Sequence, residues 1–424
     1  MGPIAIFDKS ALEMLSIDES CWLDNFFLCN ITPLFYAECL ADLAKTPKAG
    51  KSTRSSIDIV AEISEKTPSM SCYPNAYHQA LITQDLIGNK VNMSNRIILA
   101  GGQAKQTTEG KIGVHYDVFP EVEAMQRWQK GEFLEIEAIV AANWRKGLSS
   151  FDFDSRTAWV KNIIPVGTKL SSLSDIKVFL DNFIKSKDKE TFELAYYLFD
   201  LPKNVIEIVE RRRQALNKPF SEFASYAAFC FKIDLFFYLS VHLGFISKDR
   251  PSNRIDIAYL YYLPFCQVFI SNDKLHKKTA PLFMEIGQTF VDGQELKPAL
   301  KEFDGYYSKL PDEEKAKGIL SFALYPPLEI DNLVTKLWDK HLSPKWREDF
   351  KEKQNKKDNL PKDKELLKKL KEQQENSIPI DKHLSSDEAD HIMITHNIFA
   401  RKGKWQIIAQ EIVDNANKSD KTDS

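Results

Sequence analysis

Four acidic residues, Asp8, Glu38, Asp256 and Asp273, form a set that could do chemistry together. Each follows a short apolar run or falls in the first turns of an expected helix. Carboxylates that converge repel one another, and a fold keeps them together only if they are solvated, protonated or neutralised by a bound cation. The four acids therefore predict a cation site, provided that the elements around them meet.

Two short strands are expected to position Asp8 and Asp273. The apolar run 4–7 ends at Asp8, and the run 268–270 is followed by Ser-Asn-Asp273. Such short apolar runs are typical of a parallel sheet, and open α/β folds bind ligands beyond the carboxyl ends of their strands. Because neither strand is stable alone, we expect both in one sheet, although about 260 residues separate them.

Helices are expected to carry the other two acids. Pro33 suits the first turn of a helix that has Glu38 on its second turn. The segment 253–264 predicts a helix that starts near Asp256, continues through an apolar run and ends at its proline. A serine at position 10 and a glutamate at position 13 predict a capping box for the helix after the first strand.

The order of these residues along the chain follows a family pattern. The matching pieces are Asp8-Lys-Ser10-Ala-Leu, Glu38 after the turn at Thr32, Asp256-Ile-Ala, and Ile270-Ser271-Asn272-Asp273. In this order the chain resembles a PIN-like nuclease domain. The resemblance implies an α/β fold, with a PIN-like parallel-sheet core formed by residues 1–44 and 250–297.

The resemblance also implies a function. A member of this family would be an Mg²⁺- or Mn²⁺-dependent endonuclease, acting on single-stranded RNA more often than on DNA. Asp8, Glu38, Asp256 and Asp273 would be the catalytic metal ligands, because hard cations prefer carboxylate oxygens. Ser10, Ser271 and Asn272 would support them, by orienting the carboxylates or contacting phosphate.

The remaining segments lie outside the resemblance. Residues 45–249 show apolar residues at helical spacing and predict an inserted, mainly helical domain, with a Gly-rich loop at 100–113. Residues 298–424 are charge-rich and predict a helical extension whose last ten residues are disordered. Asp387 and His391 have metal-ligand spacing, but surface polar residues are the commoner interpretation. The insertion or the extension could bind a protein partner or a second copy.

Composition limits the other possibilities. The 424 residues are 43% apolar, enough for two or three domains, and the net charge of −3 gives no general attraction to nucleic acid. A nucleic-acid surface must therefore be local, and Arg211, Arg212 and Arg213 are the weak candidates. Glutamates at helical spacing could instead pair with these arginines.

The cysteines and the most apolar segment bear on the cellular compartment and on membrane association. The six cysteines lack any C-x-x-C pair and stand in apolar contexts, which favours core thiols in a reducing cytoplasm. The most apolar window, 226–246, approaches the length of a membrane span. Lys232, Asp234 and His242 interrupt it, so a buried helix and no membrane association are expected.

Other interpretations of the acids stay open. Asp8 and Asp273 could be helix N-caps, Asp256 a capping-box acid and Glu38 an exposed helix residue. The domain could also be a catalytically silent binding or scaffold module, or a metal-dependent phosphohydrolase of small substrates. If the acids only repel one another, replacing Asp8 or Asp273 with asparagine should leave the metal-free protein as stable as wild type, or slightly more stable.

Overall fold

The computed structural model describes most of the chain in atomic detail. The described residues are 2–45, 55–68, 73–74, 76–98, 103–106, 110, 112–115, 120–149, 153–343, 345–355, 378–379, 393–395 and 400–410. The Asp387–His391 pair and the last ten residues, for which the sequence makes predictions, lie outside these ranges.

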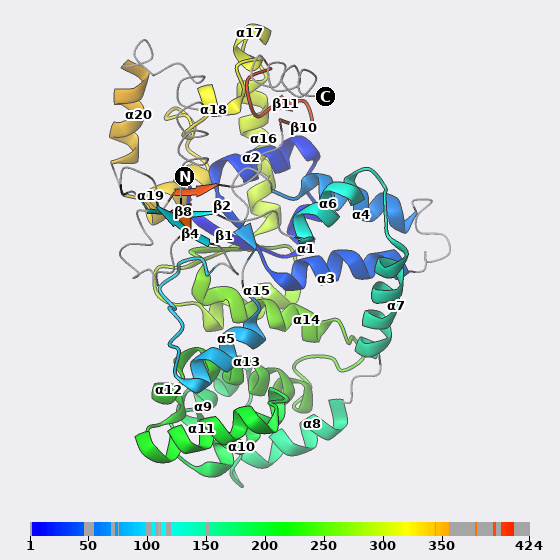
Figure 1. Ribbon diagram of the computed structural model, residues 1–424, viewed down its shortest axis with the longest axis vertical. Helices are drawn as coiled ribbons and strands as arrows, with labels where there is room; N and C mark the ends of the chain where they lie inside the picture. The colour runs from blue at the N-terminus through cyan, green and yellow to red at the C-terminus, as the bar shows by residue number, and fades with distance from the viewer. Residues whose placement is uncertain are drawn as a thin grey trace.

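A parallel sheet of five strands lies at the centre of the fold (Figure 1). Its order is β3-β2-β1-β6-β7, with bounds β1 Ile4–Phe7, β2 Leu28–Ile31, β3 Tyr73–Pro74, β6 Val268–Ser271 and β7 Thr289–Asp292. Strands β1 and β6 pair directly, with Ala5 opposite Val268. The expectations of an α/β fold and of one sheet shared by these two strands are therefore confirmed.

Helices surround the sheet. In chain order they are α1 Lys9–Glu13, α2 Ile17–Phe26, α3 Pro33–Ala41, η1 Asp42–Ala44, α4 Ser56–Lys66, α5 His78–Ile87, α6 Pro120–Gln129, α7 Glu135–Ser149, α8 Phe153–Val160, η2 Lys161–Ile163, α9 Leu173–Phe183, α10 Lys189–Leu198, α11 Lys203–Leu216, α12 Phe220–Phe223, α13 Ser225–His242, α14 Asn253–Ala258, η3 Tyr259–Phe265, α15 Lys274–Phe283, α16 Gly293–Tyr307, α17 Asp312–Lys315, α18 Ile319–Phe322, α19 Leu333–His341 and α20 Trp346–Asn355.

The two faces of the sheet enter two separate cores. Side chains alternate along a strand, so Phe7 and Ile270 point into a core shared with α2, α16 and α19. Ile6 and Phe269 point into the other core, which is built mainly from α5, α9, α10, α13 and η3. Figure 1 shows these two groups of helices on opposite sides of the sheet.

Strand β1 stands where the winding of the sheet reverses. From β1 the chain runs outward to β2 and β3 on one side, while β6 and β7 lie on the other. All pairings are parallel, so the carboxyl ends meet at one edge. In open α/β sheets ligands bind at such a reversal, and here the segments after β1 and β6 lie at it.

Several local expectations need correction. The helical pattern 121–144 is two helices, because the chain turns at Gly131 with φ of 73°. The segment 221–243 is likewise divided, at Ala224. The α-helix from Asn253 ends at Ala258, before Pro264, and the chain continues as the 3₁₀ helix η3. Because Pro264 has no N–H, the Tyr261 carbonyl accepts from the Tyr226 hydroxyl at 3.1 Å instead.

The Gly-rich segment at 100–113 is not simply a loop. It contains β4, Gln103–Gln106, which pairs antiparallel with β5, Ile112–His115. These strands join β8, Ile378–Pro379, and β9, Met393–Thr395, in a second sheet. A final hairpin of β10, Arg401–Lys402, and β11, Trp405–Gln406, docks on α2 and α16: both the Trp22 and the Trp405 indoles donate to Asp304.

The most apolar window forms α13, which is a buried helix as expected. Within it Lys232 pairs with Asp181 at 2.8 Å and Asp234 pairs with Arg254 at 2.8 Å. In the part of the chain that the structure describes, no helix is both long and apolar enough to cross a membrane. The five cysteines that lie in this part are all buried and free, as core thiols should be.

Candidate functional site

Asp8 lies at the reversal point, directly after β1. Its carboxylate caps α1 by accepting the Ala11 N–H at 3.0 Å, and the Ser10 hydroxyl donates to both carboxylate oxygens at 2.8 Å. The expected capping box of Ser10 and Glu13 does not form, because Asp8 already takes the N-cap position and engages the serine hydroxyl.

Ser271 links Asp8 to the neighbouring strand. From the end of β6 its hydroxyl donates to Asp8 Oδ2 at 2.7 Å and accepts the Asp273 N–H at 3.0 Å. The Asn272 N–H donates to Ser10 Oγ at 2.9 Å from the same segment. The ends of β1 and β6 are thus joined by side-chain hydrogen bonds across the reversal point.

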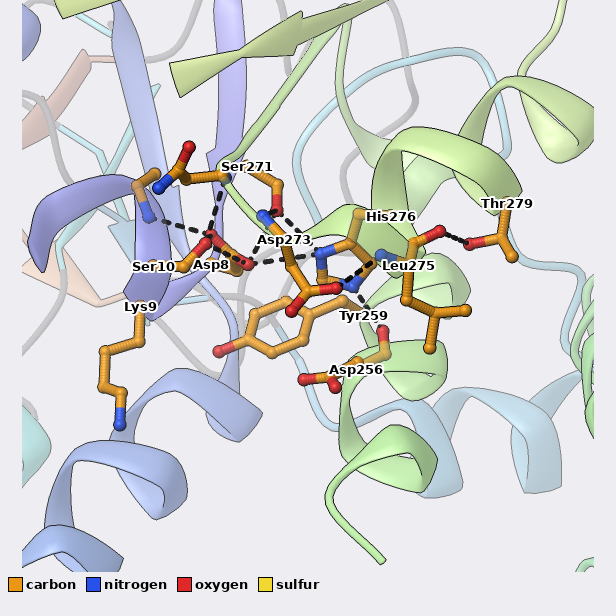
Figure 2. A network of polar contacts seen from close by, with 12 residues as sticks. Asp8, Lys9, Ser10, Asp256, Tyr259, Ser271, Asp273, Leu275, His276 and Thr279 are labelled. Carbon is orange, nitrogen blue, oxygen red and sulfur yellow. Dashed lines mark hydrogen bonds and ion pairs between the residues drawn. The ribbon is translucent and has the colours of Figure 1, made fainter. Parts of the chain in front are cut away.

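His276 completes this network, and sequence reasoning missed it (Figure 2). The ring is fully buried; Nδ1 lies 2.8 Å from Ser271 Oγ and 3.1 Å from Asp8 Oδ2, while Nε2 lies 2.5 Å from the Asp256 carbonyl. In the sequence the only signal is one histidine in the first turn of the helix after β6. This signal is weak, because the family pattern was built on the acidic residues.

The contacts of His276 require the charged ring. Nε2 faces a carbonyl and Nδ1 faces a carboxylate, so both nitrogens must donate. Burial opposes this charge, but the hydrogen bond and charge of Asp8, with the carboxylate and carbonyl of Asp256, raise the pKa of His276 to about 9. Asp8 and His276 therefore form a buried ion pair.

Asp273 begins α15 as its N-cap. Its Oδ1 accepts the Leu275 N–H at 2.6 Å, and the side chain is partly exposed. Asp273 is thus a helix cap, as the alternative interpretation holds, yet it also lies beside the site: its charge helps to raise the pKa of Asp256. Capping uses one oxygen, and among the described residues no donor contacts the other.

Asp256 lies on α14 at the far side of His276. Among the described residues its carboxyl has no hydrogen-bond or ion-pair partner. Burial, together with the charges of Asp273, Glu38 and Asp8, raises the pKa of Asp256 to about 7, although His276 opposes the shift. Burial is the largest of these effects, and the three neighbouring carboxylates add to it.

Glu38 approaches from α3, which has Thr32 as N-cap and Pro33 in its first turn, as expected. The Tyr259 hydroxyl donates to Glu38 Oε2 at 2.8 Å, and Lys9 Nζ lies 3.6 Å from Oε1. Burial raises the pKa of Glu38, against the opposing effect of Lys9, and the Asp8 charge adds to the rise.

Lys9 is the second buried cation that sequence reasoning missed. It points away from the Asp8 side chain (Figure 2), and its Nζ donates to Asp42 at 2.8 Å. Burial disfavours its charge, but Glu38 and Asp42 outweigh this and raise the pKa of Lys9. Each of two site carboxylates, Asp8 and Glu38, thus already has an internal cation beside it.

The predicted metal site is not assembled in this conformation. Within the described ranges, no three His, Cys, Asp or Glu side chains are grouped so that they could hold one ion. The carboxylates of Asp256 and Asp273 nevertheless keep oxygens that no internal donor uses. A cation would therefore have to draw these side chains together with Asp8 or Glu38.

The remaining predicted residues have structural partners. The Asn272 amide oxygen accepts from Gln294 Nε2 at 3.1 Å. Arg212 donates to the Leu86 and Phe223 carbonyls, and Arg213 pairs with Glu210 at 2.8 Å. Arg212 and Arg213 are thus half-buried and already paired, and Arg211 alone of the three is exposed; the nucleic-acid surface at these arginines stays a prediction.

The His276 ion pair predicts that the metal-free protein loses stability as pH rises. Its pKa of about 9 exceeds the ordinary 6.5, so its stabilisation is complete below about 6.5 and is lost as pH passes 9. The Asp256 carboxyl adds to the loss of stability as pH rises through about 7, because its proton is bound more tightly in the folded state than in the unfolded state. Urea unfolding in EDTA should show a loss on the order of 3 kcal/mol between pH 6.5 and 9.

The matched control for this pH effect is His276→Gln. This variant should be less stable at pH 6.5 and should show a much flatter profile up to pH 9. A wild-type profile as flat as that of the variant would mean that His276 is neutral in the folded protein.

Comparisons with known proteins add no relative: no family model, no curated protein and no solved structure matches this chain.

Proposed function

We propose that this protein is a metal-dependent nuclease that hydrolyses phosphodiester bonds, with RNA a more favoured substrate than DNA. The proposal includes a PIN-like core of residues 1–44 and 250–297, with a helical insertion and a C-terminal extension. The observation that carries it is the junction of Asp8 with Ser271 across the reversal point of a parallel sheet. Open α/β sheets bind their ligands at this place.

The donor set fits Mg²⁺ or Mn²⁺. Both ions prefer carboxylate oxygens and tolerate bound water, so Asp256 and Asp273 would hold the ion with Asp8 and Glu38 as direct or water-mediated ligands. The raised pKa of Asp256 supports this assignment, because its half-buried carboxyl lies near like charges that a cation would neutralise. When bound, such an ion activates water and stabilises the charge that develops on a phosphate.

The chain's own residues prepare the carboxylates. Ser10 and Ser271 fix the Asp8 carboxylate from two sides, and the Tyr259 hydroxyl fixes Glu38. Asp256 would bind the cation in its deprotonated form. Metal affinity is therefore expected to rise as pH increases through about 7.

A second candidate is a catalytically silent binding or scaffold module. Its support is the pair of internal cations: Lys9 beside Glu38 and His276 on Asp8 neutralise part of the cluster without any metal. A third candidate is a phosphohydrolase that acts on a small substrate. Such a substrate needs no extended basic surface, and Arg212 and Arg213 already have partners within the protein.

The deciding experiment incubates the full chain with labelled single-stranded RNA, labelled single-stranded DNA and a chromogenic phosphomonoester, each with Mn²⁺ or with EDTA. The nuclease proposal expects RNA cleavage in Mn²⁺, weaker or no DNA cleavage and none in EDTA. Release of chromophore alone would identify a phosphohydrolase instead. No turnover of any substrate, with no Mn²⁺-dependent rise in melting temperature, would favour the silent module.

A further inference from the structure

Helix α7 exposes an apolar face. One side of α7 packs along α3 and buries Ala141 completely. On another side Ile136, Ile139 and Val140 are 57, 50 and 45% exposed. The helix runs along an outer edge of the molecule (Figure 1), so this face is open to a partner.

The exposed residues form one continuous stripe. Positions 136, 139, 140, 143 and 147 follow the three- and four-residue spacing of a single helix face. Asn143 and Gly147 continue the stripe, and both are exposed. Clustered aliphatic side chains on an exposed helix are unfavourable in water and are typical of a protein contact. Trp144, 37% exposed and four residues after Val140, borders the stripe.

Two charges flank this stripe in a pattern that identifies the partner. Glu135 and Lys146 are both exposed and lie about three helical turns apart, hence on the same flank. In the described part of the chain neither forms an ion pair. They stand at equal distances from the point between Val140 and Ala141, which is also close to the middle of the apolar stripe.

We propose that the α7 face binds the α7 face of a second copy of this chain, with the two helices antiparallel about a two-fold axis between Val140 and Ala141. Glu135 then lies opposite Lys146 of the second copy, and Lys146 lies opposite its Glu135. A two-fold contact repeats each interaction, so both ion pairs form together. A parallel arrangement would place like charges opposite each other. The antiparallel helix dipoles also favour the proposed orientation.

Sedimentation of the full chain tests the association. One helix face per copy makes a small interface, so a reversible dimer is expected over loading concentrations from about 5 to about 300 µM. Val140→Glu places two carboxylates beside the axis and should keep the protein monomeric throughout. Val178→Glu changes a valine on α9 that is 56% exposed, somewhat more than Val140, and should dimerise like wild type.

Charge exchange tests the orientation. Glu135→Lys and Lys146→Glu should each weaken dimerisation roughly tenfold at low salt, because each converts two attractive pairs into repulsive ones. The double variant Glu135→Lys/Lys146→Glu should recover wild-type association. Unchanged melting temperatures show that all variants are folded. A wild-type protein that stays monomeric, or a double variant no better than the singles, overturns the proposal.

Discussion

Asp273→Asn should reduce RNA cleavage by orders of magnitude while leaving the stability of the metal-free protein almost unchanged. The amide keeps the shape of the side chain but loses the charge that would bind the cation. Asparagine caps a helix about as well as aspartate, so the bond from the Leu275 N–H can be retained. Removing the charge also removes one of the like charges that raise the pKa of Asp256. Cleavage rates in Mn²⁺ and urea unfolding in EDTA measure the two effects.

Asp292→Asn is the matched control for this substitution. Asp292 also ends a strand of the sheet and caps the next helix, through the Gln294 N–H at 2.9 Å, but its ion-pair partner is the exposed Lys277. This variant should cleave RNA at close to the wild-type rate. If Asp273→Asn also cleaves like wild type in an active preparation, Asp273 has no part in catalysis.

Asp8→Asn should destabilise the metal-free protein by about 3–5 kcal/mol, because it removes one partner of a buried ion pair. The charged His276 ring would be left without its counter-ion, while its Nε2 would still face the Asp256 carbonyl. This replaces the expectation from the sequence that an asparagine at this position is harmless. Urea unfolding in EDTA at pH 6.5, where the ring is charged, measures the loss.

A double-variant cycle with His276→Gln checks that the loss comes from the ion pair. Residues in direct contact show non-additive effects, so Asp8→Asn/His276→Gln should cost clearly less than the two single variants together. Additive losses would mean that Asp8 stabilises the fold mainly as the cap of α1, and the ion pair would then contribute little.

Much of the framework could be predicted from local sequence. The strand 4–7 and the strand after Gln267 are short apolar runs, and Pro33 after a threonine cap signals α3. Strands β2 and β7 were missed. In β2 the buried Asn30 interrupts the apolar pattern, and β7 is only partly buried, so neither shows the continuous hydrophobicity of a central strand.

The polar network could not be predicted, because its members come from separate elements. His276 and Lys9 are chemically ordinary in the sequence, and only burial beside Asp8, Glu38 and Asp42 makes them counter-ions. Arg212 shows the reverse case: a residue of a basic run becomes a donor to backbone carbonyls. The low polarity of a protein interior strengthens the interactions between the charges that the fold brings together. The spacing of residues in the sequence does not show which charges these are.

The sequence by itself determined which acids stand at the ends of β1 and β6 and at the starts of helices, because apolar runs and caps are local signals. Only the tertiary structure decided that β1 and β6 are neighbours, that Asp8 is paired with a charged histidine, and that the Asp256 carboxyl has no partner among the described residues. The physical reason is that the pKa and the partners of a buried charge depend on groups within a few ångströms in space, which here come from segments more than 200 residues apart along the chain.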